Sequence, residues 1–238
     1  MPRANEHVVV IGGTSGLGHH VAQASAALGA RVTVTGRDLD RAQHAAQGLS
    51  GDAAARSCDL TDWDSIERLF QSLDGVDHLI LCALQRDHNT IADFNPGASA
   101  KTSLMKNVGY AAAVHFALPR LSSDGSVVMF SGLSMWMPMP GSTTISMANA
   151  GVIGLVNSLA TQIAPVRVNA VTPGVVAGTP AVDDADATRM DRYAALRLRT
   201  PGQRLPTPAD VVAATFALTD NPGINGANLV VDGGMHLA

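Results

Sequence analysis

The sequence predicts a doubly wound α/β fold, in which a seven-stranded parallel sheet carries helices on both faces. Short β-branched runs alternate with alanine-rich, helix-length stretches along all 238 residues, which is the pattern of repeated strand–helix–strand units. Glycine, proline, aspartate or serine ends each helical stretch. No internal repeat, low-complexity tract or linker interrupts the pattern, so residues 1–238 are expected to form a single domain.

Seven short runs are expected to form the strands: 7–12, 31–36, 53–58, 78–83, 126–131, 167–172 and 228–232. Six helices are expected between them: 17–28, 39–49, 63–73, 99–121, 144–164 and 208–219. Two segments, 85–97 and 175–206, break the alternation. Ligand sites in such sheets lie at the carboxyl ends of the strands, so both segments are candidate lids. The acidic cluster of the second, Asp183, Asp184 and Asp186, is interpreted as the solvated start of a helix.

Composition favours a small-molecule substrate. The net charge is −4, and no stretch of lysine and arginine is dense enough to follow a nucleic-acid backbone. Cys58 and Cys82 lack metal-ligand spacing, so no metal site is expected and both are interpreted as core thiols. The first apolar run, 8–11, is too short for a signal or membrane segment, so a cytoplasmic location and no membrane contact are expected.

A glycine-rich turn follows the first strand and opens the first helix: Gly12, Gly13, Thr14, Ser15, Gly16, Leu17 and Gly18. Its glycines permit a tight turn and a close backbone approach, so free N–H groups and the positive helix end meet a pyrophosphate. The alternative is a tight strand–helix turn without a ligand. The position of the turn after the first strand favours dinucleotide binding.

Arg37 ends the second strand, nineteen residues after Gly18. An acidic residue about 20 positions on would bind the ribose hydroxyls of NAD. Here Gly36 offers no carboxylate, and the guanidinium of Arg37 matches a 2′-phosphate, so NADP(H) is favoured over NAD(H). The alternative is a solvated surface arginine at position 37, and Asp38 beside it could pair with it.

Further motifs, in order, resemble the short-chain dehydrogenase/reductase family over nearly the whole chain. The glycine turn matches TGxxxGxG with Ile11 in place of threonine, and the run from Arg167 to Gly174 matches RVNxVxPG. The tail Asp232, Gly233 and Gly234 matches the family's DGG turn. The resemblance implies a Rossmann fold, a homo-oligomer, Asn107 as an active-site residue, and further cofactor-binding residues: Asp59, Leu60, Ala83, Asn149, Pro173, Gly174 and Val176.

The same alignment implies that the family's proton-donating residues are missing. Ile145 stands at the tyrosine position, Asn149 at the lysine position and Gly132 at the serine position. An isoleucine cannot donate a proton, and an asparagine carries no charge to tune a neighbour. Other residues considered as donors are more simply explained by structural or surface roles: Ser131, Ser134, Thr144, His88 and Tyr193.

Three functions are consistent with this sequence. The first is an atypical NADP(H)-dependent oxidoreductase that takes its proton from solvent, the substrate or another side chain. The second is a catalytically inactive subunit that binds NADP(H) or a partner. The third is a non-redox enzyme for cyclisation, elimination or isomerisation, with an apolar pocket formed by Met135, Trp136, Met137 and Met139.

Overall fold

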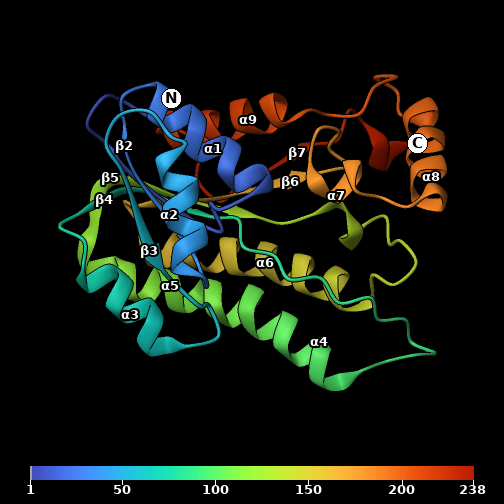
Figure 1. Cartoon of the computed structure of the whole chain (residues 1–238), viewed down its shortest axis with the longest axis horizontal. Coiled ribbons are helices and arrows are strands. Elements are labelled where there is room, and N and C mark those ends of the chain that lie inside the picture. The colour runs from blue at the N-terminus through green and yellow to red at the C-terminus, as the bar shows by residue number, and fades with distance from the viewer. Residues whose placement is uncertain (1) are drawn as a thin grey trace.

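A computed structural model describes residues 2–238, which contain one sheet of seven parallel strands (Figure 1). The strands are β1 (His7–Ile11), β2 (Arg31–Gly36), β3 (Ala53–Ser57), β4 (Val76–Leu81), β5 (Leu121–Phe130), β6 (Arg167–Pro173) and β7 (Asn228–Val231). Their order across the sheet is β3-β2-β1-β4-β5-β6-β7, and all neighbours are parallel. The predicted fold class and all seven predicted strands are confirmed.

Helices cover both faces of the sheet: α1 (Gly16–Ala27), α2 (Leu39–Gln47), α3 (Trp63–Gln71), α4 (Pro96–Ser103), α5 (Gly109–Ala117), α6 (Thr143–Gln162), α7 (Pro180–Asp183), α8 (Ala187–Arg199) and α9 (Pro208–Asp220). Successive side chains of a strand point to opposite faces. Val9 and Ile11 therefore pack with α3, α5 and α6, whereas Val8 and Val10 pack with α1, α2 and α9. Within residues 2–238, no helix is long and apolar enough to cross a bilayer.

The prediction of one continuous helix over 99–121 is wrong. A π-helical turn at Leu104–Val108 separates α4 from α5, and Leu121 already belongs to β5. A π turn adds a residue to the hydrogen-bonded ring. Apolar periodicity does not reveal one added residue, because the stretches on both sides remain helical.

The segment 175–206 was predicted to be irregular, but it contains α7 and α8. Only Tyr193 of α8 is fully buried, so the helix lacks the broad apolar stripe by which such elements are predicted. Asp186 accepts a hydrogen bond from the backbone N–H of Arg189 at 2.9 Å and caps α8. The interpretation of the acidic cluster as a helix start is confirmed at this residue.

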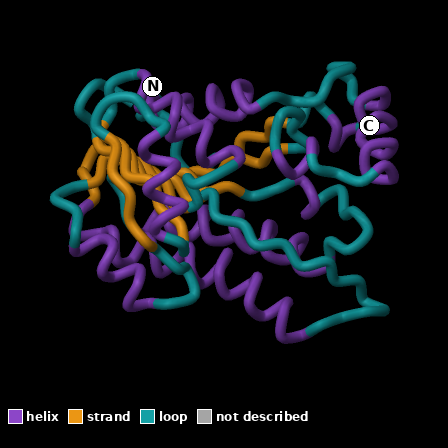
Figure 2. Tube along the Cα trace, in the orientation of Figure 1, coloured by secondary structure: helices purple, strands orange, loops and turns teal. Residues whose placement is uncertain are grey.

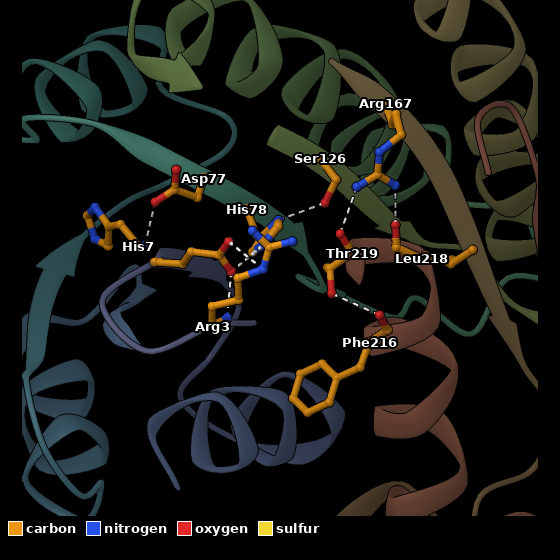
Figure 3. Close-up of polar contacts among 10 residues, drawn as sticks. Arg3, His7, Asp77, His78, Ser126, Arg167, Phe216, Leu218 and Thr219 are labelled. Atoms are coloured by element: carbon orange, nitrogen blue, oxygen red, sulfur yellow. Dashed lines mark hydrogen bonds and ion pairs between the residues drawn. The ribbon is translucent and has the colours of Figure 1, made fainter. Parts of the chain in front are cut away.

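Arg167, the first residue of β6, connects the sheet to the end of α9 (Figure 3). Its buried guanidinium donates hydrogen bonds to the carbonyl oxygens of Leu218 at 2.6 Å and Thr219 at 2.7 Å. It also donates to the carbonyl of Asn221 at 3.1 Å. These carbonyls lie at the negative end of the helix dipole, so one cation satisfies several acceptors that the helix leaves unpaired.

We expect Arg167→Met to lower the free energy of unfolding by about 2–4 kcal/mol, because it leaves buried carbonyl oxygens without a donor. Urea denaturation measures this change. The control is Arg68→Met on α3, where the exposed arginine lies 3.7 Å from Asp62. A solvent-exposed pair contributes at most about 1 kcal/mol. Equal losses in the two variants would contradict the role assigned to Arg167.

Candidate functional site

A cavity of about 640 Å³ lies at the carboxyl ends of the strands. Residues at the ends of the central strands line it, including Ile11, Gly36, Phe130 and Pro173. All residues predicted to bind the cofactor line it too: Gly12, Thr14, Ser15, Gly16, Leu17, Gly18, Arg37, Asp59, Leu60, Ala83, Asn149, Pro173, Gly174 and Val176. The structure thus brings together residues from distant parts of the sequence.

The glycine turn presents a concave backbone surface to the cavity. Gly12 has a φ of +87°, and a Cβ there would lie 2.6 Å from the backbone nitrogen of Ala83, so only glycine fits. Ser15 begins α1 without a side-chain capping bond, and no acidic residue occupies the first turn. A Cβ on Gly16 would meet nothing within 4 Å. The positive end of α1 therefore faces open space, as a diphosphate site requires.

Arg37 lies at the edge of this surface, exposed and lining the cavity. Its Nη1 donates to Oε1 of Gln85 at 3.2 Å. Asp38 accepts from the backbone N–H of Arg41 at 3.0 Å and caps α2. Among residues 2–238 no ion pair joins Arg37 to Asp38, so the guanidinium is not neutralised by its neighbour in this structure.

Asp59 and Asn107 occupy different positions relative to the cavity. Asp59 lines it and accepts hydrogen bonds from the backbone and hydroxyl of Thr61 at 2.8 and 2.7 Å, which fix its carboxylate. Asn107 does not belong to the lining. Its Nδ2 donates to the carbonyl oxygen of Ala148 at 2.8 Å, so it joins the π-helical turn to α6 behind the wall.

Ile145 and Asn149 lie one turn apart on α6 and both line the cavity. Nδ2 of Asn149 donates to Oγ of Ser134 at 2.9 Å. Its Oδ1 is buried and has no hydrogen-bond partner in the described part of the chain. A Cβ on Gly132 would lie 2.6 Å from Nδ2 of Asn149, so the absence of a side chain at 132 leaves the space that Asn149 uses.

The residues considered as replacement proton donors lie in different environments, and not all of them line the cavity. Ser131 lines the cavity but donates to the carbonyl of Asn149 at 2.9 Å. Thr144 is fully buried outside the lining and donates to Ser99 at 3.0 Å. Tyr193 lines the cavity from α8, and its hydroxyl accepts a hydrogen bond from Arg189 at 2.9 Å. Tyr193 therefore brings a phenol to the cavity lining, and the residue that donates to its oxygen is a cation.

The two cysteines remain thiols in this environment. Both line the cavity. Burial raises the pKa of Cys58 to about 12, and burial also raises the pKa of Cys82 above its ordinary value. A thiolate is the nucleophilic form of cysteine, so neither residue is activated for covalent catalysis.

The sequence analysis missed Lys106 as a cavity residue. Lys106 lies in the π-helical turn, lines the cavity and is buried. Burial lowers the pKa of its amine to about 7; the charge of Arg86 acts in the same direction, and Cys82 acts against it. One signal was present: Lys106 precedes Tyr110 by four residues, so it shares a helix face with a core residue.

We expect Gly132→Ala to lower the free energy of unfolding by about 1 kcal/mol, because the new methyl group displaces Nδ2 of Asn149 from its bond to Ser134. The same change in an Asn149→Ala background should cost less, because the obstructing amide is gone. Urea denaturation of the four proteins gives the coupling energy. Identical costs in both backgrounds would show that Gly132 and Asn149 are independent.

The chain is similar to known proteins over almost its whole length. A family profile described as enoyl-(acyl carrier protein) reductase matches residues 12–236. A 3-oxoacyl-[acyl-carrier-protein] reductase of Bos taurus is 28% identical over 236 residues, which cover 96% of this chain and 97% of that protein.

A second relative is the short-chain dehydrogenase/reductase malC of Malbranchea aurantiaca. It is 31% identical over 258 residues, and the alignment covers 98% of this chain and 95% of malC. The crystal structure of a short-chain dehydrogenase/reductase of the glucose/ribitol dehydrogenase type from Brucella melitensis superimposes with a TM-score of 0.90 at 24% identity, covering 100% of this chain and 99% of that one. The chain belongs to the short-chain dehydrogenase/reductase family.

Proposed function

We propose that this protein binds NADP(H) and transfers a hydride to or from a small organic substrate without a tyrosine as proton donor. One observation carries the proposal: a single cavity joins the glycine turn and Arg37 to an α6 wall made by Ile145 and Asn149. The 3-oxoacyl-[acyl-carrier-protein] reductase and short-chain dehydrogenase/reductase relatives support an oxidoreductase.

The residues present fit a dinucleotide. The uncapped N-terminus of α1 would hold the diphosphate, because its first N–H groups carry partial positive charge. Arg37 would bind a 2′-phosphate in place of its contact with Gln85. The unpartnered Oδ1 of Asn149 would accept a hydrogen bond from a ribose hydroxyl, which satisfies a buried acceptor.

The bound nicotinamide supplies or accepts the hydride. Ile145 contributes an apolar wall and no proton at the position that the family's motif gives to tyrosine. General acid catalysis is typically worth about 10²–10⁴-fold, so its loss slows the reduction of a ketone most. An iminium ion or a conjugated alkene is already electrophilic and depends less on a proton donor. Such acceptors therefore fit a site lined by Ile145 better than a ketone does.

Arg37→Ala should weaken NADPH binding by about tenfold or more and NADH binding much less, because only NADPH carries the phosphate that the guanidinium binds. Fluorescence titration of the reduced nicotinamide measures both Kd values. Arg68→Ala, on the exposed surface of α3, is the control and should change neither. Equal weakening of both cofactors by Arg37→Ala would show that the 2′-phosphate lies elsewhere.

Turnover tests the proposal directly. We expect NADPH oxidation, followed by its absorbance, with imines or enones at rates above those with matched ketones. Tight binding with no turnover on any of the three substrate classes would contradict hydride transfer and support the non-catalytic subunit. Absence of NADPH binding would contradict the cofactor assignment itself and leave the non-redox alternative.

A further inference from the structure

The chain contains two lysines, and the structure places them in opposite environments. Lys101 is exposed on α4, whereas Lys106 lies in the π-helical turn and is 2% exposed. Lys106 nevertheless lines the cavity, beside Cys82 from the end of β4 and Arg86 from the following loop. Figure 2 shows that loop, 82–95, extending from the sheet before α4 begins. Lys106 is therefore a buried amine at the wall of the site.

The amine has no counter-ion. Across residues 2–238, no carboxylate forms an ion pair with Lys106, and no oxygen accepts a hydrogen bond from it. The charged group that acts on it most is Arg86, which has the same sign. Burial beside another cation favours the neutral amine, as the pKa of about 7 reflects. A lysine in this state carries a free electron pair and is nucleophilic.

Positive charge lines this cavity besides Lys106. Arg86, from the loop after β4, acts electrostatically on Lys106, and Arg189 acts in turn on Arg86. Arg189 and Arg192 line the cavity from α8. Asp87 is the acidic residue of that loop in the lining, and its Oδ2 accepts a hydrogen bond from Asn89. In residues 2–238 no ion pair neutralises the three arginines. Arginines without ion-pair partners favour an anionic ligand, and a carboxylate is an anion whose geometry a guanidinium matches.

We propose that Lys106 is a nucleophilic amine that captures a small carbonyl compound bearing a carboxylate as an imine. The lone pair of Nζ adds to the carbonyl carbon, both amine hydrogens leave with the carbonyl oxygen as water, and a C=N bond to Nζ forms. A protonated imine withdraws electrons from the neighbouring carbon and acidifies its C–H bond, which supports elimination or isomerisation. This chemistry goes beyond hydride transfer, and it needs no bound dinucleotide.

Reductive trapping tests the proposal with two probes of equal chain length, succinic semialdehyde and butanal. Sodium cyanoborohydride reduces the imine to a stable secondary amine, and peptide mass spectrometry locates it on Lys101, Lys106 or the amino terminus. At pH 7, we expect Lys106 to be modified by succinic semialdehyde at least about tenfold faster than Lys101, because an ordinary lysine has a pKa of about 10.4 and is almost wholly protonated. We also expect succinic semialdehyde to react several-fold faster than butanal at Lys106.

The two lysines make the wild-type protein its own control, so the result does not depend on a variant that fails to fold. In urea the preference for Lys106 should disappear, since it arises from burial. Lys101→Arg should still acquire the adduct on Lys106, and Lys106→Met should lose it at that position. Modification of Lys101 in preference to Lys106 in the folded protein would overturn the proposal, and equal rates for the two aldehydes would overturn the carboxylate part of it.

Discussion

The site depends on how closely the glycine turn passes the end of β4. The backbone N–H groups of Gly12 and Gly13 donate to the carbonyl of Thr35 at 3.1 and 3.2 Å, which ties the turn to β2. On its other side Gly12 lies so close to Ala83 that a Cβ would be 2.6 Å from the backbone nitrogen of Ala83. The backbone N–H of Cys82 donates to the carbonyl oxygen of Ile11 at 2.8 Å. Any side chain at Gly12 would separate these strands. The close approach of the turn to β4 therefore requires glycine at position 12.

Much of this arrangement was predictable from the sequence. Strands that are buried on both faces are rich in β-branched residues, which is why most of them could be predicted. The glycine turn follows one predicted strand and Arg37 ends another. Parallel strands bring their carboxyl ends to the same edge of the sheet, so the glycine turn and Arg37 were expected to lie close together. The π-helical turn and α8 were not predictable, because one is a local change in hydrogen bonding and the other lacks an apolar stripe. Lys106 was missed because a lysine in a helix normally points to solvent, and its spacing of four residues from Tyr110 does not by itself show that it is buried.

Gly132 and Asn149 are close neighbours in the wall of the cavity. Asn149 bonds to Ser134 through the space that a side chain at 132 would fill, so a change at either position alters what the other tolerates. A side chain at 132 and the hydrogen bond between Asn149 and Ser134 therefore compete for the same space.

The loop after β4 serves both ends of the cavity through two adjacent residues. Gln85 contacts Arg37 at the end of β2, and the next residue, Arg86, interacts electrostatically with Tyr193 and Arg189 on α8. One short stretch of backbone thus carries a side chain toward the glycine-turn side of the cavity and a side chain toward α8.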